Sequence, residues 1–233
     1  MADIPYSTAL IVGAGPGISA SLARALAGAG LKVGLAARNT DKLAELATET
    51  GAATFAADAS DPVAVAKLFD AVDAKLGTPD VVVFNAAARV RGRIADIDPA
   101  DLKRAIDISA FGGFLVVQQA ARRMLPKEHG AILITGATAS VKGFPLSSGF
   151  AMGKFALRGL AQSAARELGP QGIHVAHFVI DGGVRSANRA DPADHPDSTL
   201  DPDAVAEAYL DVLRQHRSAW SWEIELRPWV ERF

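Results

Sequence analysis

The stretch VGAGPGIS, residues 12–19, decides the fold, because an apolar run gives way to a helical pattern at this point. The run before it, TALIV at residues 8–12, is short and continuous, which is typical of a fully buried parallel strand. Residues 18–29 then alternate apolar and small side chains at helical spacing and stop at Gly30. Glycines permit positive φ and close backbone approach, and a helix N-terminus offers free N–H groups to a pyrophosphate. The stretch therefore predicts a strand–turn–helix unit that binds a dinucleotide.

The same alternation of strand and helix patterns continues along the 233 residues. Further strands are expected at residues 32–37, 53–57, 80–84, 131–135, 173–180 and 220–226. Further helices are expected at residues 40–49, 61–77, 99–125, 147–168 and 201–215. Thr40 is the expected N-cap of the first of these. This order predicts an α/β fold, namely a single Rossmann-type domain over residues 1–233, with a doubly wound seven-stranded parallel sheet and helices on both faces.

One irregular segment, residues 185–200, contains Pro192 and Pro196 and follows the C-terminal end of a predicted strand. Open α/β sheets bind ligands at that end of their strands. We therefore expect residues 185–200 to form a substrate lid.

Composition excludes several classes of function. The chain has no cysteine, so it has no disulfide, no thiolate nucleophile and no cysteine-based metal site. Its net charge is −2 and it has no basic run, so the sequence does not predict binding to nucleic acid or to a membrane surface. No apolar run approaches the ~18 residues of a membrane span, and the N-terminus lacks a signal-peptide pattern, so we expect a cytoplasmic protein. His174 and His177 lie at odd spacing in a predicted strand and face opposite sides, so no metal site is predicted.

The glycine-rich turn and the motifs that follow it resemble those of the short-chain dehydrogenases/reductases over nearly the whole chain. The family motif T-G-x-x-x-G-x-G falls on Val12, Gly13, Gly17 and Ser19, with serine in place of the third glycine. In the segment FNAAA, Ala86 and Ala88 replace the second Asn and the Gly of the family's N-N-A-G. After the sixth strand, Asp181 stands for the family's proline. The resemblance implies cofactor contacts from Gly13, Gly15, Gly17, Ile18, Asp58, Ala59, Asn85, Ala86, Lys154, Gly182, Val184 and Ser186.

The end of the second strand bears on the choice between NADP and NAD. The family's aspartate, which accepts a hydrogen bond from the 2′-hydroxyl of NAD, would fall at Ala37, and Arg38 follows it. A cation at this place pairs with a 2′-phosphate, and the missing carboxylate removes the repulsion. NADP is therefore the predicted cofactor, with NAD as the less favoured alternative.

The chemical residues of the family are only partly present. The resemblance places a Tyr and a Lys of Y-x-x-x-K on one helix face, and these positions hold Phe150 and Lys154 in SSGFAMGK. The serine that orients the substrate falls at Ala137 by spacing from Phe150, or at Thr138 in the glycine-aligned register. The asparagine that anchors a relay water falls at Ser109. A phenyl ring donates no proton, so the usual family mechanism does not apply unchanged.

Three sources of the proton remain open from the sequence. Lys154 itself would serve if desolvation lowered its pKa. A water held by Ser109 and Lys154 is a second source. The hydroxyls of Thr138, Ser140, Ser147 and Ser148 form the third group, although unactivated hydroxyls orient better than they donate. The chain's tyrosines, Tyr6 and Tyr209, are both distant in sequence from this segment.

Two functions of different classes follow. The first is an NADP-dependent oxidoreductase acting on a small carbonyl or an activated alkene with an unusual proton donor. The second is a catalytically weak or inactive NADP-binding sensor or partner subunit; a pocket for a different nucleotide is a third reading. The resemblance also implies a homodimer or homotetramer built on the long helices, where Phe155, Leu157 and Leu160 are apolar enough to serve. The sequence does not name the substrate or the direction of hydride transfer.

Overall fold

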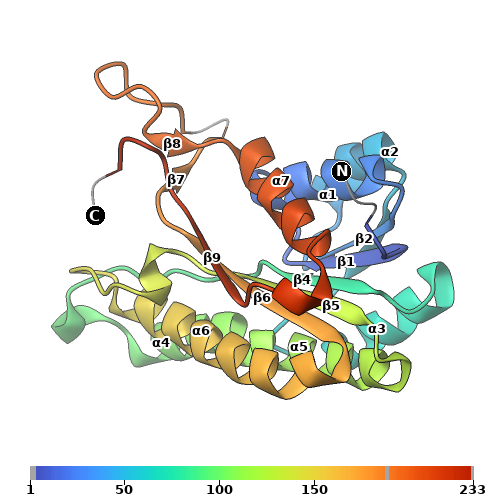
Figure 1. The fold of residues 1–233 in the computed structure, drawn as a ribbon. Coiled ribbons are helices and arrows are strands. Elements are labelled where there is room, and N and C mark those ends of the chain that lie inside the picture. Colours follow the sequence, from blue (N-terminus) through green and yellow to red (C-terminus); the bar gives the residue numbers. More distant parts are fainter. Residues whose placement is uncertain (1–3, 187–188, 232–233) are drawn as a thin grey trace.

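Seven parallel strands form the sheet at the centre of the molecule, in the order β3-β2-β1-β4-β5-β6-β9 (Figure 1). The computed structural model describes residues 4–186 and 189–231. The strands span β1 Thr8–Val12, β2 Lys32–Ala37, β3 Ala53–Ala56, β4 Val81–Phe84, β5 Gly130–Thr135, β6 Ile173–Ile180 and β9 Glu223–Leu226. The predicted doubly wound parallel sheet is therefore confirmed. The chain order reverses between β1 and β4, and such switch points are where open α/β sheets bind ligands.

Helices cover both faces of this sheet, also as predicted (Figure 1). One face carries α1 (Ile18–Gly28), α2 (Ala44–Thr50) and α7 (Pro202–Leu213). The other carries α3 (Pro62–Leu76), α4 (Pro99–Ile106), α5 (Gly112–Met124) and α6 (Ser148–Leu168). Alternate residues of a strand enter opposite cores: Ile11 packs on the α1 and α7 side and Leu10 on the α3, α5 and α6 side. Burial on both faces explains why the strands read as continuous apolar runs.

The helix predicted at residues 99–125 is not a regular α-helix throughout. α4 ends at Ile106, residues Asp107–Phe111 form a π-helical turn, and α5 begins at Gly112. Gly112 lies against β3's following loop, where an added Cβ would come within 2.8 Å of the Ala59 carbonyl oxygen. Within the turn, Ser109 is buried and its Oγ accepts a hydrogen bond from the Ala88 N–H at 3.1 Å. The turn therefore fits α5 closely against the loops that follow β3 and β4.

Two boundaries predicted from sequence are wrong. Thr40 makes no capping hydrogen bond; instead Asn39 Oδ1 accepts from the Asp41 N–H at 2.9 Å, and a 3₁₀ turn precedes α2. The last strand begins at Glu223 rather than at residue 220. Trp220 lies before the strand, and its ring stacks on His174, with ring centroids 4.6 Å apart. Local side-chain contacts, which the sequence pattern does not show, accompany both differences.

The segment expected to be a lid is anchored at its base. β7 (Gly183–Val184) pairs in parallel with β8 (Thr199–Leu200), and the chain between them projects away from the sheet (Figure 1). Arg185 lies 3.3 Å from an Asp191 carboxylate oxygen and 3.4 Å from one of Asp201. Residues 187 and 188 of the predicted lid lie outside the described residues. Among the described helices, none is long and apolar enough to cross a membrane.

Candidate active site and cofactor cleft

A pocket of about 550 Å³ opens where β1, β2, β3 and β4 end. Val12 pairs with Phe84 across β1 and β4, so the residues that follow them, Gly13 and Asn85, meet at the switch point. Gly13 has φ 86°, and an added Cβ would come within 2.3 Å of the Ala86 nitrogen. Only glycine fits this crossing. The pocket is lined by Val12, Gly13, Ala14, Ala37, Arg38, Asn39, Lys42, Ala57, Asp58, Ala59, Asn85, Ala86, Ala87 and Ile108.

The N-terminus of α1 has the form of an anion cradle. Gly17 precedes the helix with φ 84°, no side chain caps the helix, and its first turn holds no acidic residue. A Cβ added to Gly15 would meet no atom within 4 Å, so the turn borders open space. Uncapped N–H groups and the helix dipole favour a phosphate at such a place. The residues present therefore fit the pyrophosphate of a dinucleotide.

The far end of this pocket carries positive charge. Arg38 and Lys42 line it, and Ala37 supplies no carboxylate. Asp58, across the pocket, is held by hydrogen bonds from the Ser60 hydroxyl at 2.7 Å and the Ser60 N–H at 2.9 Å, and these bonds lower its pKa. Asp58 is thus a fixed, ionised acceptor. Sequence reasoning missed Lys42, because it lies in a 3₁₀ turn that no motif of the sequence marks as part of the site.

Asn85 connects this cleft with a second pocket. Its Nδ2 donates to Ser19 Oγ at 2.6 Å, and Ser19 Oγ lies 3.4 Å from the Gly13 carbonyl oxygen, which ties α1 to the loop after β4. Asn85 and Ala87 line both pockets, so the two are continuous. The second, about 360 Å³, is called the reaction pocket below. Its other lining residues are Ile18, Arg89, Arg91, Thr135, Gly136, Ala137, Thr138, Ala139, Phe144, Ser147, Phe150, Lys154, Ile180, Gly182, Val184 and Arg189.

Lys154 is the buried cation of the reaction pocket. Its side chain comes from α6, the residue is only 3% exposed, and Nζ donates to the Thr135 carbonyl oxygen at 2.6 Å. Burial, and secondly the positive charge of Arg89, lower the pKa of Lys154 to about 7. At neutral pH the amine is therefore poised between its charged and neutral forms.

Phe150 stands one helical turn before Lys154 and carries another cation. The Arg89 guanidinium carbon lies 4.3 Å from the centroid of the Phe150 ring, and Lys154 Nζ lies 5.9 Å from it. A guanidinium over a ring face at this distance is a cation–π contact. Burial, and secondly the charges of Arg91 and Arg189, lower the pKa of Arg89. The ring thus serves as a platform for a guanidinium beside Lys154.

The structure gathers most of the residues predicted for the site; four of them, Gly15, Gly17, Ser109 and Ser186, line neither pocket. Six of the predicted cofactor residues line the first pocket: Gly13, Arg38, Asp58, Ala59, Asn85 and Ala86. The reaction pocket brings together Ile18, Asn85, Thr138, Phe150, Lys154, Gly182 and Val184. Ser109 lines neither pocket and lies behind α6, where a Cβ on Gly153 would come within 2.8 Å of the Ser109 Cβ. Ser186 is exposed and pairs through its backbone with Arg189.

The tyrosines do not supply the missing hydroxyl. Tyr209, remote in sequence, reaches Thr135, with Oη 2.8 Å from Thr135 Oγ1. Tyr209 is fully buried, and that burial raises its pKa. Tyr6 stacks on His129, and burial raises its pKa to about 12. Neither phenol therefore releases a proton near neutral pH.

The histidines of β6 have structural partners. His177 Nδ1 lies 3.0 Å from Glu223 Oε2, and burial lowers its pKa to about 4, so the ring is neutral and donates to the carboxylate. Glu223 also receives both arms of Arg158 from α6 at 2.7 Å. His174 stacks on Trp220. Within residues 4–186 and 189–231, no three His, Asp or Glu side chains come together as a metal site.

Comparison with known proteins gives a consistent result. The family model described as short chain dehydrogenase matches residues 7–195. The 3-dehydrosphinganine reductase TSC10B of Arabidopsis thaliana is 33% identical over 181 residues, which are 74% of this chain but only 54% of that protein. A short-chain dehydrogenase from Rhodopseudomonas palustris is 36% identical with a TM-score of 0.82, covering 96% of this chain and 99% of that one. An alcohol dehydrogenase of the archaeon Thermococcus sibiricus, complexed with 5-hydroxy-NADP, is 26% identical with a TM-score of 0.84, covering 97% and 98%.

Proposed function

The chain belongs to the short-chain dehydrogenase family of oxidoreductases, and from this premise we propose that it is an NADP-dependent reductase of a small carbonyl compound or an activated alkene. The observation that carries the proposal is the position of Lys154. A buried amine with a pKa of about 7 lines a pocket that opens directly into the dinucleotide cleft. Such an arrangement brings a proton donor to the place where a hydride acceptor would lie.

NADP is the cofactor that this cleft favours over NAD. Arg38 and Lys42 offer two cations to a 2′-phosphate, and Ala37 presents no opposing carboxylate. The similar archaeal alcohol dehydrogenase, whose structure holds 5-hydroxy-NADP, supports the same choice. When bound, the reduced cofactor supplies a hydride from its nicotinamide. Gly13, Gly15, Gly17 and Ile18 would hold the pyrophosphate side, and Gly182 and Val184, which line the reaction pocket, the nicotinamide side.

Lys154 supplies the proton in place of the absent tyrosine. Its ammonium group gives one proton to the substrate oxygen of a carbonyl, or to the carbanion carbon of an alkene, and becomes a neutral amine that solvent protonates again. The Arg89 guanidinium, held over Phe150, stabilises the negative charge that develops on the oxygen. Thr138 lines the same pocket and orients the carbonyl group. Ser109 acts as a positioning residue, because it supports α6 beside Lys154 and the loop carrying Arg89.

The segment at residues 185–200 is proposed to cover the bound substrate. Val184 and Arg189, on either side of its start, both line the reaction pocket. Its base is fixed by the β7–β8 pair and by the contacts of Arg185. Movement of the part between these anchors would admit substrate and then exclude water.

The test is oxidation of NADPH, followed by absorbance, against a panel of ketones, aldehydes and enones. We expect turnover with the wild-type protein and a loss of at least ~100-fold with Lys154→Met, because a positioned acid contributes ~10²–10⁴ to the rate. Retained NADPH binding by the variant would show that the loss concerns chemistry. Silence of the wild-type protein across the panel, despite tight NADPH binding, would contradict the proposal.

One observation favours an alternative, a cofactor-binding protein without turnover. The ring of Phe150 and the guanidinium of Arg89 fill the place where a phenol hydroxyl acts in relatives. The variant Phe150→Tyr separates the two. If the wild-type protein is silent and Phe150→Tyr reduces ordinary ketones, the site is a dormant one. Titration with NADP, NAD and other nucleotides, followed by protein fluorescence, ranks the ligands of the cleft in either case.

A further inference from the structure

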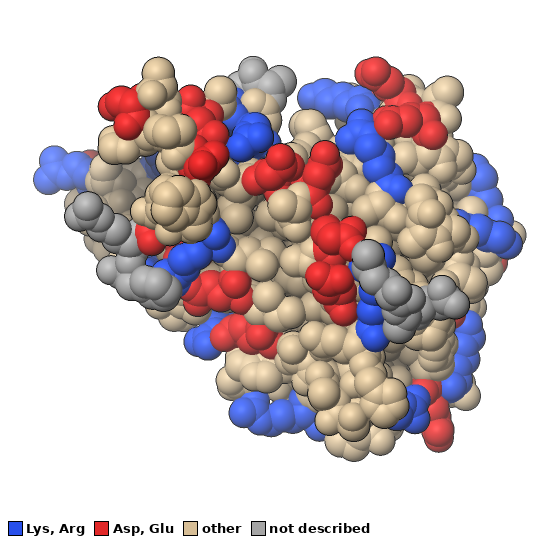
Figure 2. All heavy atoms as spheres, turned by 45° about the horizontal axis from the view of Figure 1, so that its top comes forward, with Lys and Arg blue, Asp and Glu red and all other residues tan. Residues whose placement is uncertain are grey.

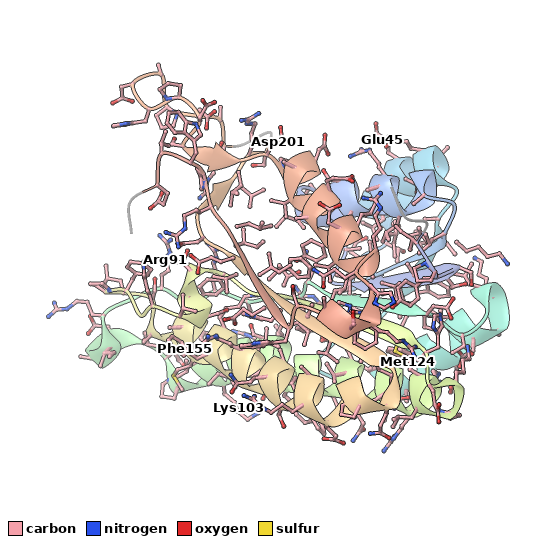
Figure 3. All side chains as sticks on the ribbon, in the orientation of Figure 1. Glu45, Arg91, Lys103, Met124, Phe155 and Asp201 are labelled. Carbon is pink, nitrogen blue, oxygen red and sulfur yellow. The ribbon has the colours of Figure 1, made fainter. Side chains whose placement is uncertain are left out.

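Three guanidinium groups line the reaction pocket together with Lys154: those of Arg89, Arg91 and Arg189. They come from two separate segments: Arg89 and Arg91 (labelled in Figure 3) from the loop after β4, and Arg189 from the segment after β7. No aspartate or glutamate lines this pocket among the described residues. Burial, and secondly the charges of Arg91 and Arg189, lower the pKa of Arg89, in keeping with the place of all three in one pocket.

These arginines differ from the other arginines around the site. Arg158 is paired with Glu223 and Arg185 with Asp191, whereas the three pocket arginines form no ion pair with a carboxylate in the described part of the chain. On the face shown in Figure 2, basic and acidic side chains are interspersed. Cations gathered without counter-charges repel one another, and an anion bound among them relieves that repulsion. The guanidinium fork also matches the oxygens of a carboxylate or phosphate.

The cofactor does not account for this charge. Its pyrophosphate fits the uncapped N-terminus of α1, and its 2′-phosphate fits Arg38 and Lys42, which line the other pocket. The nicotinamide end enters the reaction pocket beside Lys154, where the substrate must also lie. The three arginines of the reaction pocket therefore remain for the substrate.

We propose that the substrate is an anionic carbonyl compound or enone whose carboxylate or phosphate group binds Arg91 and Arg189, while Arg89 faces its reacting end. This inference rests on the proposed reductase function, because it assigns the substrate class of the same pocket. Arg89, on the Phe150 platform, holds the end of the substrate nearest Lys154. Arg91 and Arg189 then hold the anionic end.

The test is calorimetric binding of matched probe pairs to the protein saturated with NADP⁺. One pair is 4-oxopentanoate and its methyl ester; the other is dihydroxyacetone phosphate and dihydroxyacetone, so the pairs distinguish carboxylate from phosphate. We expect the anionic member of at least one pair to bind tenfold or more tightly. Arg91→Gln and Arg189→Gln should each weaken it ~10- to 100-fold, the range for a hydrogen bond to a charged group. Arg93→Gln is the control, because Arg93 is paired with Asp96 on the same loop and does not line the pocket.

Affinity for NADPH is measured in the same variants, so that the two ligands are separated. Equal binding of the anionic and neutral members, or no binding of any probe, overturns the inference. Weaker NADPH binding in both variants with unchanged probe binding also overturns it, because the cations would then serve the cofactor. Charge-selective binding without NADPH oxidation supports the anion site while contradicting the reductase function.

Discussion

Lys154 is the residue whose environment has the most direct consequence for activity. Burial lowers its pKa from 10.5 to about 7, so its ammonium form, the proton donor, is present below about pH 7 and is lost above it. We expect kcat/KM for reduction to fall about tenfold per pH unit above pH 7, since kcat/KM reports the free enzyme. A pH profile with saturating NADPH measures this. A flat profile to pH 9 would show that Lys154 is not the donor.

The same shift predicts a pH dependence of stability. The folded pKa of Lys154 lies below that of the unfolded chain, so between about pH 7 and 10.5 the unfolded chain binds more protons. The contribution of Lys154 to the free energy of unfolding therefore rises with pH through this window and is at its lowest below pH 7. Urea unfolding across this range measures the free energy of unfolding of the wild-type protein minus that of Lys154→Met, which should decrease as pH falls from 10.5 to 7. A constant value would contradict the shift.

Arg38 decides the preference between the two nicotinamide cofactors. We expect Arg38→Gln to weaken NADPH binding by ~10- to 100-fold, because a hydrogen bond to a charged group contributes ~1.5–3 kcal/mol, and to leave NADH binding nearly unchanged. Fluorescence titration of both cofactors measures this. Lys32→Gln is the control, because Lys32 is exposed at the opposite end of the same strand, β2. Equal losses for NADPH and NADH would mean that Arg38 does not contact the 2′-phosphate.

The residues of the site that sequence predicted are those tied to a strand end or a helix turn. Asp58 and Asn85 follow strands, and Lys154 is fixed by its spacing on one helix, so topology alone brings them to one edge. The three arginines of the reaction pocket were not predicted, because a sequence does not show which charged side chains lack an ion-pair partner. The contact of Tyr209 with Thr135 was not predicted either, because it joins residues 74 positions apart.

At the scale of elements, α6 fits the π-helical turn through Gly153. An added Cβ would come within 2.8 Å of the Ser109 Cβ, which is attached to the backbone and cannot rotate away. We expect Gly153→Ala to lower the free energy of unfolding by ~1–3 kcal/mol, the usual cost of overpacking. Gly159→Ala, on the same helix with no atom near its added Cβ, should raise it by up to ~1 kcal/mol through helix propensity. Thermal unfolding compares them; equal Tm values would show that the contact is soft.

The type of a helix or strand was predictable where its hydrophobic pattern was clear. Its boundaries were not predictable where they coincide with contacts between segments distant in sequence. Continuous apolar runs gave the buried strands β1, β4, β5 and β6. The π-helical turn at Asp107–Phe111 was not predicted, because the apolar pattern of the helix continues through it. The close approach of Gly112 to Ala59, which follows the turn, joins segments far apart in the sequence. β9 likewise begins three residues later than the alternating pattern predicted, and Trp220, before it, stacks on His174 from β6.

At the scale of the whole molecule, the switch point between β1 and β4 places the cofactor cleft, and α6 with the loops beside it borders the reaction pocket. The dinucleotide cleft depends on the short loops after strands, which sequence motifs mark. The reaction pocket is closed by segments from the loop after β4, from α6 and from the chain around β7, which are distant in sequence. The substrate class therefore depends on tertiary structure more than the cofactor does.

The outer face of α5 and α6 is apolar, and we expect it to form the interface of a homodimer or homotetramer. Phe111, Phe114 and Phe155 are 42%, 44% and 45% exposed there, and Phe155 projects from α6 (Figure 3). Leu157, which we expected to share this face, instead points into the core and is fully buried. A hollow of about 340 Å³ beside Phe114 and Leu160 could receive side chains of a second copy of the chain.

Sedimentation equilibrium at micromolar concentration tests this assembly. We expect the wild-type protein at two or four times the 24.3 kDa of one chain, since a stable interface buries ~800 Å² per partner and needs an apolar centre. Phe114→Glu combined with Phe155→Glu should yield a monomer that still binds NADPH, because both side chains lie outside the cofactor cleft. Val63→Glu, a change at an exposed apolar residue on α3, should leave the mass unchanged. A wild-type mass of one chain, or dissociation by Val63→Glu as well, would contradict an interface on α5 and α6.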